Sequence, residues 1–461
     1  MLIKKIVYSV FLAFSIVCIA NATIYYADDT GIGSGDCPIG APCTLSRGLT
    51  MLSAGDTLYL REGTYQQVVS FSTNGTSENR IIISGYTGET ATIDGNNTYP
   101  TGGGTCWDNL VTISGDYVTL KDLYITNSTE ICASISGDYS NVENVSIDGC
   151  GETGIVASGE SNIFDGVTQT DNGNRYGGGC ATWGAAIGTL GSNTIIRNSI
   201  SHDNVGEGIN CYSSASSCTI EDSISYDNDS VDLYLDSVTT ALVQRNLLYN
   251  TGVGGARTGL MIGAEYSQPS GLTIINNMII GDYEYQALGI DSNVTSMNTY
   301  TIAYNTFGTV QATDGYNWNV RLTGSGMGTY TNSIFKNNIV FNDNDDGTTY
   351  PVYVAASHSG LTLSYNSWYE TPSAQAQGTG DVIEDDPCIQ DGSVTPGNLT
   401  GNHFMQNSGS LSIDNGNAIA GITEDYFETA RDASPDIGAH EYEAEPTIIK
   451  KIMNYFRRLR G

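Results

Sequence analysis

Residues 194–212 read TIIRNSISHDNVGEGINCY and residues 218–236 read CTIEDSISYDNDSVDLYLD, which is one pattern written twice. In both copies apolar residues alternate with polar ones over short runs, and Gly, Asn, Asp or Ser interrupts each run. Alternation with a period of two is typical of half-buried strands, and the interruptions are typical of turns. The stretch therefore predicts two short strands per repeat, separated by turns.

The same pattern extends over most of the chain. An Asn or Asp recurs after the apolar residues of the first strand, at Asp122, Asn144, Asp165, Asn198, Asp222, Asn246, Asn277, Asn305, Asn338 and Asn366. A second strand follows at 154–158, 208–212, 232–236, 259–263, 289–293, 320–324 and 352–356. The spacing is about 27 residues, which lies in the range that indicates stacked repeats.

Two strands and two turns per repeat describe a coil whose successive turns pair in parallel, with a spacing of about 4.8 Å. An aligned row of Asn suits such a coil, because each amide can donate to the next. The pattern predicts an all-β fold, a parallel β-helix. A β-sandwich is the competing architecture, but it would not repeat one register ten times. Earlier strands at 57–60, 80–84 and 91–94 bring the total to roughly a dozen coils.

The two ends of the β-helix need covering, because an open sheet edge promotes aggregation. Residues 44–52 are apolar at helical spacing and precede the first of these strands, so we expect an N-terminal capping helix there.

Both ends of the repeat region also resemble a known superfamily. The opening motifs are IYYADDTG (24–31), APCTLSRGL (41–49) and AGDTLYLREGTY (54–65), and the closing motif is SPDIGAHEY (434–442). They are similar to those of secreted right-handed parallel β-helix proteins of the pectate-lyase-like superfamily, over about residues 24–442. The resemblance implies a right-handed coil and an extracellular polysaccharide as the partner.

The first residues have the features of an export signal: Lys4 and Lys5, an apolar run over 6–20, and the small residues of 20–22. We expect a signal peptide at 1–22, an N-terminal cap at 23–57, the β-helix at 58–375, a closing segment at 376–442 and a basic amphipathic tail at 447–461. The tail can attach to an anionic membrane surface or polymer, or dock on the acidic body of its own chain. A secreted or cell-surface monomer is expected.

The charge of the chain excludes one class of partner. It has 50 acidic and 18 basic residues, a formal net charge of −32. Nucleic-acid binding depends on neutralising phosphates, so nucleic acid is not an expected partner.

Export implies an oxidising compartment, in which most cysteines pair. Cys37 and Cys43 are close enough to close a small loop, as are Cys211 and Cys218. The mature chain has nine cysteines after Cys18 leaves with the signal, so at least one is free or intermolecular.

Alternation in the second strands predicts which side chains point outward. The aligned apolar residues Ile209, Leu233, Leu260, Ile290, Val320 and Val352 should point inward. The outward face then holds tyrosines, carboxylates and an arginine, which suit a sugar polymer. We expect Tyr212, Tyr234, Asp291 and Tyr353 to bind substrate. The alternative is that these residues only decorate a solvated sheet.

Residues 228–233, NDSVDL, resemble the Asp-Asp-Gly-x-Asp-Leu calcium loop of a pectate-lyase family in this superfamily. Asp229 and Asp232 match acidic ligands, Asn228 replaces one, and Asn204 lies at a ligand position one coil earlier. The resemblance implies Ca²⁺ as a cofactor.

In that family the next coil carries Gly-x-Phe-Lys-Leu-Gly, whose lysine abstracts a proton. Here Met261 stands at the lysine position, and a thioether cannot accept that proton at neutral pH. Arg257 and Arg321 are the alternative bases, provided that a neighbouring charge lowers the pKa.

A carboxylate pair is the second catalytic option. Glu207 lies one coil before Asp229 and Asp232, which is close enough for an acid–base pair of a glycoside hydrolase. The sequence thus predicts a protein that engages extracellular polysaccharide, as a calcium-assisted lyase or a related carbohydrate-active enzyme. The rival hypothesis is a non-catalytic cell-surface or adhesive protein that binds carbohydrate.

Overall fold

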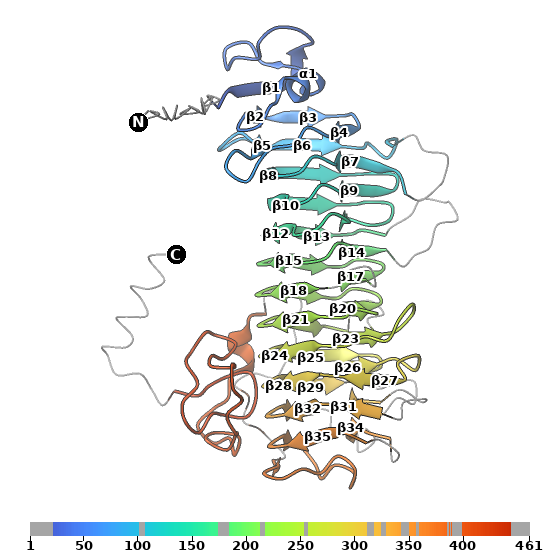
Figure 1. Ribbon diagram of the computed structural model, residues 1–461, viewed down its shortest axis with the longest axis vertical. Coiled ribbons are helices and arrows are strands. Elements are labelled where there is room, and N and C mark those ends of the chain that lie inside the picture. Colours follow the sequence, from blue (N-terminus) through green and yellow to red (C-terminus); the bar gives the residue numbers. More distant parts are fainter. Residues whose placement is uncertain are drawn as a thin grey trace, which may run out of the picture.

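The chain winds into a long rod of stacked parallel strands, as Figure 1 shows. This computed structural model describes residues 22–100, 107–173, 184–212, 217–252, 257–310, 318–323, 329–342, 350–355, 359–384, 387, 389 and 399–443. The predicted right-handed parallel β-helix is confirmed. No helix in these ranges is long and apolar enough to cross a membrane. The expected signal peptide, apart from its last residue, and the expected basic tail lie outside the described residues.

Each coil carries up to three strands, and the first two belong to one large sheet that has 24 described strands in two rows. The first row begins with β1 (Ile24–Ile32), which pairs with β2 (Thr57–Leu60). It continues through β5 (Ile81–Gly85), β8 (Val118–Thr126), β10 (Asn141–Asp148), β12 (Ile163–Asp165), β15 (Thr194–Arg197), β18 (Cys218–Glu221), β21 (Ala241–Gln244), β24 (Leu272–Ile275), β28 (Thr301–Ala303), β32 (Ser333–Lys336) and β35 (Leu361–Ser364).

The second row lies after the first in each coil. The long strands β8 and β10 extend into it. Its other members are β3 (Gly63–Tyr65), β6 (Ala91–Asp94), β13 (Thr168–Thr170), β16 (Ile200–His202), β19 (Ile224–Tyr226), β22 (Leu247–Asn250), β25 (Met278–Tyr283), β29 (Thr306–Val310), β33 (Ile339–Val340), β36 (Ser367–Trp368) and β37 (Val382–Ile383).

The third strand of each coil belongs to a separate eleven-stranded sheet. Its members are β4 (Val69–Phe71), β7 (Asn109–Ile113), β9 (Ile131–Ile135), β11 (Ile155–Ala157), β14 (Ala185–Thr189), β17 (Glu207–Cys211), β20 (Val231–Asp236), β23 (Thr258–Gly263), β26 (Gln286–Ile290), β30 (Trp318–Arg321) and β34 (Tyr350–Tyr353). Strands β27 (Ser296–Asn298) and β31 (Thr329–Thr331) form a further pair.

Inward-facing apolar side chains from all three rows form one continuous core along the rod. Ile209, Leu233 and Leu260 follow one another in register and are fully buried. Because each coil buries its apolar side against its neighbours, the core grows with the number of coils.

The sequence pattern suggests that its ten Asn and Asp positions form a single row. In the structure they occupy different positions at the turn. Asp165 pairs with Arg197, so it lies one position before the turn between the first two strands. Asp122, Asn144, Asn198 and Asp222 occupy the turn itself, with φ between 50° and 56°. Asn246, Asn277, Asn305, Asn338 and Asn366 lie one position later and are buried.

The buried asparagines form the ladder that the repeat predicts, over five coils. Each backbone N–H and each side-chain amide donates to Oδ1 of the next asparagine, as for Asn305 and Asn338 with both distances 3.0 Å. The Asn305 amide also donates to the Ile274 carbonyl, 2.9 Å away. The ladder therefore satisfies backbone groups at the interior of the turn, where no water reaches them.

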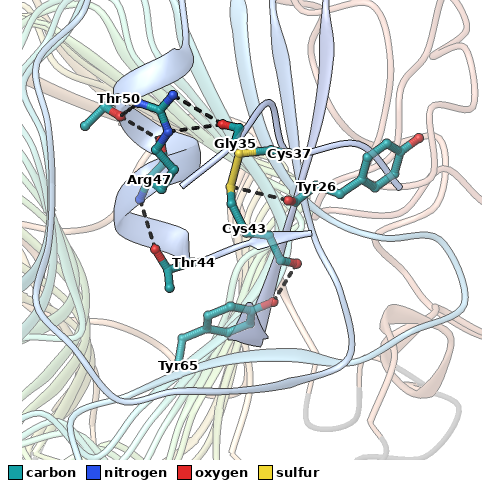
Figure 2. The surroundings of a disulfide bond; sticks show 9 residues. Tyr26, Gly35, Cys37, Cys43, Thr44, Arg47, Thr50 and Tyr65 are labelled. Atoms are coloured by element: carbon teal, nitrogen blue, oxygen red, sulfur yellow. Dashed lines mark hydrogen bonds between the residues drawn. A yellow bond between two sulfur atoms is a disulfide. The ribbon is translucent and has the colours of Figure 1, made fainter. Parts of the chain in front are cut away.

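The N-terminal end is covered by helix α1 (Leu45–Met51), as expected (Figure 1). Thr44 caps the helix by accepting from the Arg47 backbone N–H. The Cys37–Cys43 disulfide holds the preceding loop against β1, and the Arg47 side chain donates to the Gly35 carbonyl (Figure 2). The cap thus combines a helix, a disulfide and a loop closed on itself.

Three disulfides join described cysteines. Cys37–Cys43 and Cys211–Cys218 are the two expected short loops. Cys132–Cys150 joins β9 to the end of the following coil's strand β10. Cys106, Cys180 and Cys388 lie outside the described residues.

The C-terminal segment, residues 399–443, folds back along the side of the rod, next to β24 and β28 in Figure 1. It starts with the short helix η1 (Gly401–Phe404) and contains no strand among its described residues. Its contacts reach several coils, since the Asn276 amide donates to the Glu424 carbonyl and the Ala439 N–H to Thr306 Oγ1. The proposed domain limits remain predictions.

Candidate carbohydrate site

The outward face of the eleven-stranded sheet carries most of the predicted substrate-binding residues. Asn210, Tyr234, Met261, Gly289, Arg321 and Tyr353 follow one another in register on β17, β20, β23, β26, β30 and β34. The predicted alignment was wrong at β26, where Leu288 pairs with Leu260 and Val320 in place of Ile290. Asp291 therefore lies two positions beyond the row of Tyr234, beside Gly263.

Glu207 is a candidate catalytic residue whose pKa is shifted by its surroundings. Its side chain begins β17 and is only 6% exposed. The Asn210 amide donates to its Oε2 at 2.7 Å and the Tyr212 hydroxyl donates to the same oxygen at 3.2 Å. Burial raises the pKa of Glu207 to about 7, although both hydrogen bonds oppose the shift.

Two further carboxylates lie near Glu207, and their negative charges contribute to its raised pKa. Glu265 is exposed and accepts from the Tyr234 hydroxyl at 3.2 Å. Asp236 is fully buried, and its Oδ1 accepts from the Glu265 backbone N–H at 2.9 Å. We call Glu207, Tyr212, Tyr234, Asp236 and Glu265 the carboxylate–tyrosine cluster.

Local backbone and packing hold the two tyrosines of this cluster. Their rings meet edge to face with centroids 6.4 Å apart. The Tyr234 ring lies over Gly263 on the next coil, where an added Cβ would overlap the Tyr234 hydroxyl. The absence of a side chain at Gly263 therefore leaves the space that lets Tyr234 reach Glu265.

The four proposed calcium ligands are only partly brought together. Asn204, Asn228 and Asp232 are buried and bonded to one another, whereas the Asp229 side chain is exposed. The Asn204 amide donates to Asn228 Oδ1 at 2.8 Å, and the Asn228 amide donates to Asp232 Oδ1 at 2.8 Å. The Asp232 side chain is fully buried, so this residue of the implied ligand set points into the protein and not to solvent.

The oxygens of this group already accept hydrogen bonds. Asp232 Oδ2 accepts from the Tyr283 hydroxyl at 2.7 Å, and burial raises the pKa of Asp232 well above its usual range. Ca²⁺ prefers several ionised carboxylates that face one cavity. Neither the amide donors nor a carboxyl group that resists ionisation fits that need, and no group of three or more His, Cys, Asp or Glu in the described ranges is placed to hold a metal ion.

The two candidate arginine bases lie on other coils than Glu207. Arg257 immediately precedes β23 and is exposed. Arg321 ends β30, four strands from β17, which corresponds to about 19 Å along the rod. Its Nε donates to the Thr323 carbonyl at 3.2 Å. Met261 lies on β23 beside Tyr234, and its thioether cannot serve as the base in place of the missing lysine.

Sequence reasoning missed Glu265. It follows β23 outside the repeating pattern, in the turn of residues 264–270. The register partner of Asp236 is Gly263, which lies two residues before Glu265. That spacing could have connected the two carboxylates only once the register was known.

The fold is that of the right-handed parallel β-helix proteins, and part of the chain is similar to pectate-lyase-like relatives. Residues 25–241 match the family model described as the Pel9A-like right handed beta helix region.

Individual relatives are distant. The pectate disaccharide-lyase of Dickeya chrysanthemi is 22% identical over 309 residues, which are 61% of this chain and 38% of that protein. The chain thus spans well under half the length of this curated relative. The structure of the pectate lyase Pel9A covers 92% of this chain and 98% of its own, with 17% identity and a TM-score of 0.56. The complex of XylC with xylose covers 91% and 98%, with 12% identity and a TM-score of 0.61.

Proposed function

We propose that this protein is a carbohydrate-active enzyme that cleaves a polysaccharide at the carboxylate–tyrosine cluster. In this proposal the polymer lies on the outward face of the eleven-stranded sheet. The match of residues 25–241 to the Pel9A-like region, and the fold that the chain shares with the pectate lyase Pel9A, support polysaccharide as the substrate. The tyrosines of the face offer apolar ring surfaces and hydroxyl groups, the two features that sugar rings need.

One observation carries the catalytic part of the proposal. Glu207 is buried, holds two hydrogen-bond donors and has a pKa of about 7. A carboxyl group that keeps its proton near neutral pH can protonate the leaving oxygen of a glycosidic bond. This is the role that one of two carboxyl groups performs in glycoside hydrolysis.

The second carboxylate in this proposal is Glu265. Its side chain is exposed to water, and the Tyr234 hydroxyl donates to it. A buried acid with a raised pKa and a second carboxyl group near it are the two groups that acid–base hydrolysis uses. Asp236 is a positioning residue, since it accepts from the Glu265 N–H. General acid–base catalysis of this kind typically contributes about 10²- to 10⁴-fold.

A lyase reaction is the second candidate, favoured by the fold of the relatives. Proton abstraction next to a uronate needs a base, and Arg321 or Arg257 is the candidate in this chain. The resemblance implies calcium assistance for this candidate, but the contacts of Asn204, Asn228 and Asp232 do not fit the ion, so the candidate does not depend on these residues.

The products of cleavage test the proposal. The protein is incubated with neutral and acidic polysaccharides, with and without Ca²⁺. We expect new reducing ends without unsaturated uronate, and a loss of at least about 100-fold in Glu207→Gln. The matched control is Glu160→Gln, which changes an exposed glutamate on a turn of the coil. Unsaturated products would favour the lyase candidate, and retention of polymer without cleavage would favour a non-catalytic binding protein.

Export to an oxidising compartment is part of the proposal. Three disulfides among the described cysteines support it, since such bonds persist in extracellular proteins. Attachment through the tail at 447–461 and a monomeric state are further proposals.

A further inference from the structure

A hollow of about 420 Å³ opens on the eleven-stranded sheet, near the far end of the rod from α1. The strands β30 and β34 supply one wall, and residues 371–375 supply the other. Its volume lies in the range that is typical of small-ligand pockets. Figure 1 shows β34, which pairs with β30, in the lower part of the rod, on the side away from the C-terminal segment.

Three aromatic rings line this hollow. Trp318 and Tyr350 are register partners on β30 and β34. Tyr353 contacts Trp318 with ring centroids 4.5 Å apart and a tilt of 42° between the planes. Tyr350 is 56% exposed although its ring is large and partly apolar. An exposed ring beside a tilted pair forms a surface on which a sugar ring can stack.

The remaining lining matches a sugar rather than an ion. None of the ten described lining residues is charged, in a chain that has 50 acidic residues. Thr371, Ser373 and Gln375 supply hydroxyl and amide groups at the opposite wall. A formal charge of −32 on the chain disfavours the approach of a polyanion, whereas a neutral sugar meets no such penalty.

The hollow is aligned with the carboxylate–tyrosine cluster. Ile209 and Val320 belong to one register row, through Leu233, Leu260 and Leu288. Glu207 and Trp318 each lie two residues before their member of that row, so they occupy equivalent positions on β17 and β30. Four strand spacings separate Glu207 from Trp318, about 19 Å. A polymer bound at Glu207 and running along the rod axis would reach the hollow after a few sugar residues.

From this geometry we infer that Trp318, Tyr350 and Tyr353 form a distal subsite for a neutral sugar residue of the polymer. The inference rests on the proposed function for the direction of the polymer, and it specifies the substrate class. Arg321 lies next to Tyr353 in register, so an acidic sugar is the competing ligand.

Binding to the uncleaving variant tests the subsite. Glu207→Gln is titrated with soluble xylan, mannan and glucan and with polygalacturonate, and tryptophan fluorescence and calorimetry report affinity. We expect at least one neutral polymer to bind, and Trp318→Ala in the same background to weaken it roughly tenfold. Tyr350→Ala should weaken it as well, and its exposed side chain makes a folding defect less of a concern. Trp107→Ala is the matched control, because Trp107 is 71% exposed and lies at the other end of the sheet.

Chain length gives the second readout. Oligosaccharides too short to span from Glu207 to the hollow should bind equally well to Glu207→Gln with and without Trp318→Ala. Longer oligosaccharides should bind more weakly when Trp318→Ala is present. Unchanged affinity for long neutral chains in both aromatic variants would overturn the subsite, as would binding of polygalacturonate alone. If Glu207→Gln still cleaves while Trp318→Ala loses affinity, the catalytic proposal fails and the subsite stands.

Discussion

Glu207 has a raised pKa because its carboxyl group loses water on folding, and this predicts a pH dependence of stability. The folded pKa is about 7, above the unfolded value near 4.5, so the neutral form is the one that the fold favours. Its contribution to stability is present below pH 4.5 and is lost as the pH rises towards 7. We expect the free energy of unfolding to fall by on the order of 2–3 kcal/mol across that window, and Glu207→Gln to lack this part of the decrease. Urea unfolding of both proteins at several pH values measures the difference, and parallel curves would contradict the shifted pKa.

Tyr212 permits a test of the proton-donor role itself. Its hydroxyl donates to Glu207 and so favours the ionised carboxylate, which lowers the pKa of Glu207. Activity of a proton donor should decline as the pH rises through about 7. In Tyr212→Phe the decline should move to higher pH, by up to about one unit. A pH profile of kcat in both proteins checks this. A shift to lower pH, or none, would show that Glu207 is not the group that titrates.

Asp232 is one of the calcium ligands that the resemblance implies. Its hydrogen bonds predict that the protein does not need Ca²⁺ at this position. Asn228 and Tyr283 donate to its two oxygens. We therefore expect no rise of Tm with Ca²⁺ that depends on Asp232, so wild type and Asp232→Asn should respond to Ca²⁺ and to chelator in the same way. Thermal unfolding measures this. A Ca²⁺-dependent rise that disappears in Asp232→Asn would restore the calcium site. The double variant Asn204→Asp with Asn228→Asp is the positive control, because it returns two carboxylates to the implied ligand positions.

At the level of elements, the turn between the first two strands depends on the asparagine ladder. The Asn305 side chain makes bonds to the Ile274 and Ala303 carbonyls and to two other ladder members. Asn305→Ala leaves these buried groups without partners, and we expect a loss of roughly 2–5 kcal/mol in the free energy of unfolding. Asn298→Ala, at an exposed position of β27, should cost less than about 0.5 kcal/mol. Equal losses in chemical denaturation would indicate that the ladder contributes no special stability.

The same turn shows which features of the fold could be predicted from the sequence and which could not. The repeat predicted strands, coil and capping helix, because alternation and spacing depend only on which residues point inward. It did not predict the row of each Asn, because Asn serves the turn in two ways. At Asn198 it adopts the left-handed conformation of the turn, and at Asn246, one position later, it bonds inward. Both choices give nearly the same spacing along the chain.

The candidate site was predictable to a smaller extent. Glu207, Tyr212 and Tyr234 follow from the repeat, since their strands keep its register. The burial of Asp232 was not predictable from the repeat, because its contacts with Asn228 and Tyr283 form only in the folded chain. Glu265 lies in a connection whose length differs from coil to coil, so only the folded chain brings it to Tyr234.

Across the whole molecule, the C-terminal segment is the part that connects distant coils. In a solenoid each coil contacts only its neighbours, so coils can unfold one after another. Arg431 counters this tendency. Its guanidinium pairs with Glu441 at 3.0 Å, lies 3.9 Å from the centre of the Tyr304 ring and donates to Asn276 at 2.9 Å. The segment therefore ties coils of β24 and β28 to one another.

Removing that guanidinium should change how the rod unfolds as well as how stable it is. The Arg431 side chain is 2% exposed and that of Glu441 is 7% exposed, so Arg431→Ala leaves a buried carboxylate without its partner. We expect a loss of about 3–5 kcal/mol, and a calorimetric transition that becomes broader or divides in two as the coils uncouple. Arg431→Ala with Glu441→Ala should recover part of the loss but not the single transition, because the contacts to Tyr304 and Asn276 stay absent. A sharp single transition in both variants would mean that packing of the segment's apolar residues, such as Phe404 and Ile437, suffices to couple the coils without the ion pair.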